Sequence, residues 1–208
     1  MHLCAIIYVV MYKSVGLKEE IIRKFIHSGS GIVICALYTI SQKDILIIGL
    51  PFLLLIILCL EALRFKGVIS VPFLRDREEK KIGGHAFFLL GASISILVFA
   101  KQIAIASILI LAIGDTASGI VLAVKGEPLE SREGYRKRIK PPEVILTMFT
   151  VSFLVGYLIV NSITIAISGA IGATIADGMY LRIYGVAIDD NLTIPLYAGF
   201  LMSLGAIW

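Results

Sequence analysis

The chain has 208 residues, of which 58% are hydrophobic and only 16% are charged. A water-soluble domain carries about 25% charged residues, and a disordered chain is far less hydrophobic, so the composition excludes both classes and favours an integral membrane protein. The net charge of +4 does not indicate nucleic-acid binding, because the positions of the charges matter more than their sum.

Eight apolar runs follow one another and predict an all-α, polytopic membrane helix bundle that forms a single domain over residues 1–208. A straight span needs about 17–25 residues, and the third, fifth and sixth runs reach this length alone. The second and fourth reach it with flanking residues, so we expect about eight transmembrane or partly spanning helices. The runs are Leu3–Tyr12, Phe25–Ile40, Ile45–Leu63, Ala86–Ala100, Ile103–Val124, Val144–Val160, Ile163–Ala176 and Ile194–Trp208.

Basic residues alternate between the connections. All of the 19 basic residues except Lys43 and Lys101 fall on one side of the predicted bundle. The positive-inside rule makes that side cytoplasmic, and eight crossings place both termini outside. We therefore expect the functional site at the cytoplasmic face, with an intracellular, anionic substrate. The alternative is that the basic loops only fix topology.

Other features of the chain carry less information. Cys4, Cys35 and Cys59 lie inside apolar runs without metal-type spacing, so we interpret them as packing residues. Asn161-Ser162 is a predicted tight turn between two runs. No small-residue cleavage site follows the first run, so we expect no cleaved signal peptide.

Arg23 and Lys24 stand where the second run begins, followed by His27 and Ser28. Residues 23 and 27 are four apart and share one helix face. Their side chains are candidates for holding phosphate groups at the cytoplasmic side. The alternative is that the two basic side chains only anchor the helix at the membrane surface.

Asp115 is the most informative polar residue, because it falls inside the fifth apolar run. About nine helical residues separate it from the cytoplasmic end, which places it about 13 Å deep. A carboxylate at that depth is costly unless it is paired or hydrated, so it is a functional candidate by default. Gly114 and Gly119 flank it and allow close approach of a backbone or a phosphate. The alternative is an acid neutralised by a neighbouring helix.

Asp189, Asp190 and Asn191 stand just before the last run, at the predicted cytoplasmic surface. Two carboxylates and an amide suit a hard divalent cation such as Mg²⁺. The alternative is that Asn191 or Thr193 caps the last helix, with Pro195 in its first turn. Four weaker features are ambiguous alone: Glu61 with Arg64, Gly83-Gly84-His85, Asp177, and Lys140 with Glu143.

Taken together, the chain resembles the CTP-dependent membrane lipid kinases, which include dolichol or polyprenol kinase, phytol kinase and CTP-dependent diacylglycerol kinase. Some related proteins carry the label phosphatidate cytidylyltransferase. In one departure, Lys140-Pro141-Pro142-Glu143 keeps the Lys and Glu of a family motif but lacks the Gly-Ser that follows. The matching segments are Arg23-Lys24-x-x-His27, Glu61-x-x-Arg64, Gly83-Gly84-His85, Leu90-Gly91-Ala92, Gly114-Asp115-Thr116-Ala117 and the run from Ile188 to Leu196.

The resemblance implies transfer of the CTP γ-phosphate to a lipid alcohol, most simply a polyprenol or dolichol, assisted by Mg²⁺ or another divalent cation. It implies a membrane lipid and CTP as partners, with no nucleic acid and no required protein partner, and it leaves homo-oligomerisation open. The membrane is the cell membrane in a prokaryote or an internal membrane in a eukaryote. The implied roles are catalysis by Asp115, Lys140 and Glu143, nucleotide binding by Arg23, Lys24, His27, Gly114 and Asn191, and metal binding by Asp189 and Asp190.

Two other functions remain open from the sequence. A cytidylyltransferase would use the same groups to make a CDP-lipid from a lipid phosphate and CTP. A transporter or scaffold would need a polar path to the outer side, where the connections offer only Lys43, Asp44, Lys101 and a few neutral polar residues.

Overall fold

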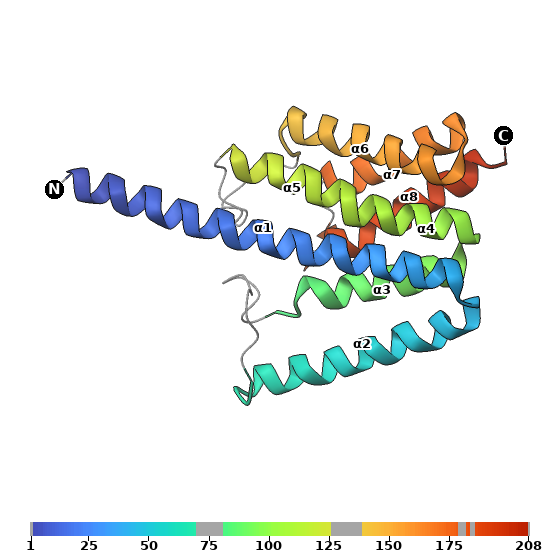
Figure 1. Cartoon of the computed structure of the whole chain (residues 1–208), viewed down its shortest axis with the longest axis horizontal. Helices are drawn as coiled ribbons and strands as arrows, with labels where there is room; N and C mark the ends of the chain where they lie inside the picture. Colours follow the sequence, from blue (N-terminus) through green and yellow to red (C-terminus); the bar gives the residue numbers. More distant parts are fainter. Residues whose placement is uncertain (1, 70–80, 126–138, 179–181, 184–185, 208) are drawn as a thin grey trace.

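The computed structural model describes residues 2–69, 81–125, 139–178, 182–183 and 186–207. Nearly all of these residues are helical, and the helices lie side by side along a common direction (Figure 1). The only strands among them form a two-residue antiparallel pair. The elements are α1 (His2–Ile40), α2 (Lys43–Phe65), α3 (Gly84–Val98), α4 (Lys101–Leu109), the π-helical turn η2 (Ile110–Gly114), α5 (Asp115–Val124), α6 (Pro142–Val160), α7 (Ile163–Gly178), β1 (Arg182–Ile183), β2 (Val186–Ala187) and α8 (Asp190–Gly205).

The first two apolar runs belong to one 39-residue helix, α1, so the expectation of two separate elements is wrong. The polar segment between the runs contains lysines and glutamates but no proline, and charged residues of these types continue a helix as readily as leucine does. Because α4, η2 and α5 also form one rod, the described residues contain seven rods. The termini consequently lie at opposite ends of the molecule and not on the same side (Figure 1).

Four helices are long and apolar enough to cross a membrane: Ile21–Ile40, Lys43–Phe65, Lys101–Val124 and Pro142–Val160. They correspond to the third, fifth and sixth apolar runs, which were long enough to span a membrane alone, and to the second run extended by its flanking residues. Two shorter apolar helices, Gly84–Val98 and Ile163–Gly178, lie beside them. Parts of two basic connections, residues 70–80 and 126–138, lie outside the described residues.

The rod from Lys101 to Val124 is at the centre of the bundle, and it is the most buried of the four candidate spans. Ile108, Ile110 and Leu111 on this rod have no exposed surface. In contrast, α2 packs mainly against α3 and leaves most of its apolar side chains exposed. Cys35 is buried as a packing residue should be, Cys59 is exposed on α2, and the side chain of Cys4 lies outside the described part.

Small residues bring α7 and α8 into close contact. A Cβ atom at Gly172 on α7 would meet the backbone of α8, 2.7 Å from the Tyr197 carbonyl carbon and 3.0 Å from the Ala198 nitrogen. At the turn between α6 and α7, Asn161 adopts the left-handed conformation that commonly ends a helix. The predicted turn at Asn161-Ser162 is therefore confirmed.

We expect Gly172→Ala to destabilise the protein by about 1–3 kcal/mol, because the added methyl group must push apart two helix backbones. Gly49→Ala on α2 is the matched control, since a Cβ atom there meets nothing within 4 Å. Thermal unfolding of the two variants in detergent measures the difference. Equal stability of both variants would contradict the close packing of α7 on α8.

Candidate functional site

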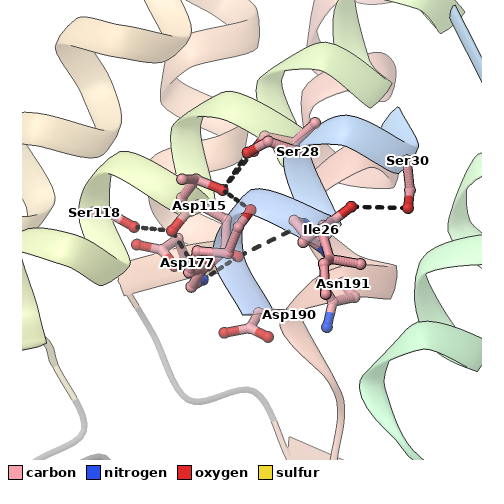
Figure 2. Close-up of polar contacts among 12 residues, drawn as sticks. Ile26, Ser28, Ser30, Asp115, Ser118, Asp177, Asp190 and Asn191 are labelled. Atoms are coloured by element: carbon pink, nitrogen blue, oxygen red, sulfur yellow. Dashed lines mark hydrogen bonds and ion pairs between the residues drawn. The ribbon is translucent and has the colours of Figure 1, made fainter. Parts of the chain in front are cut away.

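Three carboxylates from three helices meet near one end of the bundle. Asp115 begins α5, Asp177 is the penultimate residue of α7 and Asp190 begins α8. Their candidate ligand oxygens all lie within 4.8 Å of one another (Figure 2). Asp115 and Asp177 are buried, at 6% and 2% exposure, whereas Asp190 is partly exposed. We call these three residues the acid cluster.

Asp115 owes its position to an irregular stretch of backbone. The π-helical turn η2 ends at Gly114, and such single turns inside α-helices are frequently found at functional sites. Within this turn, the Ala112 carbonyl accepts hydrogen bonds from the hydroxyls of Ser28 on α1 and Thr116 on α5, both at 2.7 Å. The hydroxyls thus fix α1 against the start of α5.

Lys24 on α1 reaches across to Asp115. Its ammonium donates to the carboxylate at 2.5 Å and to the backbone carbonyl of the same residue at 3.0 Å. Gly119 makes room for this side chain, because a Cβ atom there would lie 2.6 Å from Lys24 Cε. The expected close approach at Gly119 is therefore made by a lysine side chain of the protein itself.

Lys140 forms the second buried pair, with Asp177. Its ammonium donates to Asp177 Oδ1 and lies 3.9 Å from Asp190, while its backbone N–H donates to the Gly178 carbonyl at 3.0 Å. Asp177 Oδ2 is fully buried and has no hydrogen-bond partner within the described part of the chain. One oxygen of Asp177 is thus neutralised by a lysine and the other is left without a donor.

His27 also faces the acid cluster. Its Nε2 atom lies 3.8 Å from Asp115 Oδ2 and, among the described residues, has no hydrogen-bond partner. The ring packs edge-on against Phe88 of α3, with 4.7 Å between ring centroids. The structure thus brings Lys24 and His27 of α1 beside Asp115, a grouping that the sequence alone did not indicate.

The structure separates Asp189 from Asp190. Asp189 is the N-cap of α8, and its Oδ1 accepts from the Asn191 backbone N–H at 3.0 Å and from the Asn191 amide at 2.7 Å. Neither Asn191 nor Thr193 is the cap, so the capping alternative is wrong for these two residues. The reason is that α8 begins at Asp190, four residues before the apolar run that starts at Ile194. The side chain of the N-cap Asp189 and that of Asp190 then point in different directions.

Pro195 lies a full turn inside α8 and not in its first turn. Proline has no N–H to donate to the carbonyl four residues earlier, which here belongs to Asn191. Gly91 of α3 faces this carbonyl, and a Cβ atom at Gly91 would lie 2.7 Å from it. The small residue therefore lets α3 pack against the interrupted part of α8, directly beside the acid cluster.

Two predicted site residues have other surroundings. Glu143, expected to act with Lys140, is about half exposed and pairs with Lys125 at the end of α5. Gly114 packs against α6, where a Cβ atom would lie 3.1 Å from both Met148 Sδ and Ser152 Oγ. Gly114 therefore contributes to the packing of η2 against α6. Among the described residues, Glu143 contacts Lys125 and not the acid cluster.

A second polar group joins the ends of α2 and α3. Glu61 is buried and pairs with Arg64 at 2.5 Å, as their spacing predicts, and with His85 at 3.2 Å. Arg64 also donates to the Lys81 carbonyl at 2.7 Å, and the Gly83 N–H donates to Glu61 at 3.4 Å. These contacts hold the chain where it enters α3, which is a structural role.

The acid cluster fits a hard divalent cation. Carboxylate oxygens are the ligands that Mg²⁺ and Ca²⁺ prefer, and the unpartnered Asp177 Oδ2 is a buried acceptor that such an ion would satisfy. Sequence reasoning noted Asp177 only as a weak feature, because it lies 62 positions from Asp115. The signal available was an acid at the end of an apolar helix, next to Gly178.

Comparison of the chain with protein-family models, with curated proteins and with solved structures finds no match.

We expect Lys24→Met to destabilise the protein by about 3–5 kcal/mol, because it leaves Asp115 buried without its counter-charge. The double variant Lys24→Met/Asp115→Asn removes both charges and should recover a large part of that loss. Thermal unfolding in detergent compares the three proteins. A double variant no more stable than the single one would show that the pair is not the origin of the effect.

Proposed function

We propose that the chain is a multi-pass membrane enzyme that transfers the γ-phosphate of CTP to a lipid alcohol of the polyprenol or dolichol type. The observation that carries this proposal is the acid cluster flanked by Lys24 and Lys140. Phosphoryl transfer needs positioning and neutralisation of charge more than covalent chemistry, and carboxylates with lysines supply both. The resemblance of the sequence segments to CTP-dependent lipid kinases supports the choice of donor and acceptor.

The depth of the acid cluster supports a lipid acceptor. Asp115 lies 14 residues from the start of α4 and Asp177 lies 14 residues from the start of α7. Both rods therefore place the cluster about 21 Å from the far end of the bundle. For a hydrocarbon core of about 30 Å, the cluster is recessed by about 9 Å from the nearer surface, inside the layer that a membrane lipid occupies.

We place the nearer surface on the cytoplasmic side, because the basic connections of the sequence fall at that end. CTP reaches the acid cluster from there. This depth of about 9 Å is smaller than the 13 Å expected from α5 alone, because α5 extends beyond the last residue of α7 and the first residue of α8 at this end of the bundle. In this proposal, a soluble nucleotide reaches the site from one side and a membrane lipid reaches it from the other.

Each residue has a role in this proposal. Asp115, Asp177 and Asp190 hold a divalent cation, which neutralises charge on the triphosphate when it is bound. Lys24 and Lys140 donate to phosphate oxygens, and His27 completes the polar wall beside Asp115. Asp189 fixes the start of α8 and so positions Asp190, a supporting role that replaces the direct metal contact expected for it.

The decisive experiment supplies the purified protein in lipid with CTP labelled in the α- or the γ-phosphate. Separate reactions contain a lipid alcohol (a prenol or diacylglycerol) and a lipid phosphate such as phosphatidate, the acceptor that a cytidylyltransferase needs. We expect label from the γ-phosphate in the lipid and release of CDP. Asp177→Asn should lower turnover by at least about a hundredfold, as loss of a charge-stabilising group does. Release of pyrophosphate with α-label in the lipid would instead assign a cytidylyltransferase, and no labelled lipid would reject both.

The two neighbouring aspartates are distinguished by their need for Mg²⁺. We expect Asp190→Asn to raise the Mg²⁺ concentration required for half-maximal activity by about tenfold or more, because it removes a ligand. Asp189→Asn should change that concentration much less, since asparagine is as good an N-cap as aspartate. If the two variants raise the required Mg²⁺ concentration equally, Asp189 is also a metal ligand.

A further inference from the structure

The two lysines occupy the acid cluster as a bound cation would. Lys24 bonds Asp115, and Lys140 bonds Asp177 while lying 3.9 Å from Asp190. Each ammonium group therefore sits against the carboxylates that are candidate ligands for a divalent ion. Side-chain exposures of 10% for Lys24 and 3% for Lys140 show that neither charge is screened by bulk water.

The charge of the group is nearly balanced. Three carboxylates and two ammonium groups leave a net charge of −1, whereas a site that binds a free divalent cation tightly gathers several uncompensated acids. A divalent cation brought among these carboxylates lies beside two buried ammonium groups, which repel it strongly at low dielectric. The acid cluster with its lysines in place is therefore a poor site for a metal ion alone.

Phosphate oxygens change this balance. An anionic phosphate attracts both lysines, and an ammonium that turns toward phosphate no longer neutralises its carboxylate. The carboxylate oxygens then face the cation, which also binds the phosphate. Cation and phosphate thus bind better together than either does alone.

We infer that Lys24 and Lys140 close the acid cluster to a lone divalent cation, and that the site takes a cation and phosphate oxygens only as a pair. The inference deepens the proposed function, on which it rests for the identity of the phosphate compound. It requires only phosphoryl oxygens, which a soluble polyphosphate and a lipid phosphate both carry. By reciprocity, phosphate tightens cation binding by the same factor as the cation tightens phosphate binding.

The test measures Mn²⁺ binding to the purified full-length protein in lipid nanodiscs. Enhancement of water-proton relaxation reports Mn²⁺ held by the slowly tumbling protein and not Mn²⁺ chelated by small molecules. We expect wild-type protein to bind Mn²⁺ weakly alone and at least about tenfold more tightly with tripolyphosphate. Tight binding without tripolyphosphate, or no gain on adding it, overturns the inference without the need for any variant.

The charge argument makes an unusual prediction for Lys140→Met. Removing a buried positive charge beside the carboxylates should tighten binding of Mn²⁺ alone by at least about tenfold, although it removes a polar group from the site. The same variant should lose most of the gain from tripolyphosphate. A purely structural salt bridge predicts the opposite, because its loss loosens the acid cluster and weakens Mn²⁺ binding. Unchanged or weaker Mn²⁺ binding therefore overturns the inference.

Two further variants serve as controls. Lys140→Met/Asp177→Asn keeps the net charge at −1 but removes a ligand, so it should bind Mn²⁺ no better than wild type does. Lys43→Met removes an exposed lysine at the other end of the bundle and should change nothing. If Lys140→Met does not fold, Lys24→Met carries the same expectation and decides the matter, together with the wild-type titrations.

The outcomes also separate this inference from the proposed function. Pairwise binding of Mn²⁺ and tripolyphosphate without any transfer from CTP would uphold the site and reject the kinase. Transfer of phosphate from CTP, together with tight binding of Mn²⁺ alone, would uphold the kinase and reject the inference of pairwise binding. Nanodiscs with phosphatidate, compared with nanodiscs of phosphatidylcholine, show whether a lipid phosphate replaces the soluble polyphosphate as the partner of the cation.

Discussion

Buried charges must be paired, and in this protein that requirement determines how the helices meet. An ionised side chain inside a membrane bundle is stable only beside an opposite charge or a strong hydrogen-bond donor. Lys24 satisfies Asp115 and thereby joins α1 to α5, while Lys140 satisfies Asp177 and joins the start of α6 to the end of α7. The two contacts bring together segments that are far apart in the sequence.

The irregular backbone gathers at the same place as the charges. A π-helical turn precedes Asp115, a proline interrupts α8 beside Asp190, and α7 ends directly after Asp177. Each irregularity leaves backbone carbonyls or N–H groups outside the regular helix ladder, and in an apolar environment these groups need partners. Ser28 supplies one such partner at Ala112. The same end of the bundle thus holds both side-chain and backbone polar groups.

Much of this arrangement was predictable from the sequence. Apolar runs located the helices, four of which are long and apolar enough to cross a membrane, and Asp115 was conspicuous within such a run. The continuity of α1 was missed because charge marks a change of environment and does not break a helix. The separation of Asp189 from Asp190 was missed because it depends on the residue at which α8 begins. Asp177 was undervalued because its partner, Lys140, is identified only by tertiary contact.

A structural ion-pair network and a ligand site differ in how fully the charges satisfy one another. Two lysines suffice to neutralise Asp115 and Asp177, so a purely structural network has no need of a third carboxylate. Asp190 nevertheless lies within the same 4.8 Å, and Asp177 Oδ2 is buried without a partner among the described residues. Burying an acceptor without a donor costs about 1–3 kcal/mol, which natural proteins avoid in ordinary packing. The proposed cation would satisfy this unmet acceptor, which the two lysines leave without a partner among the described residues.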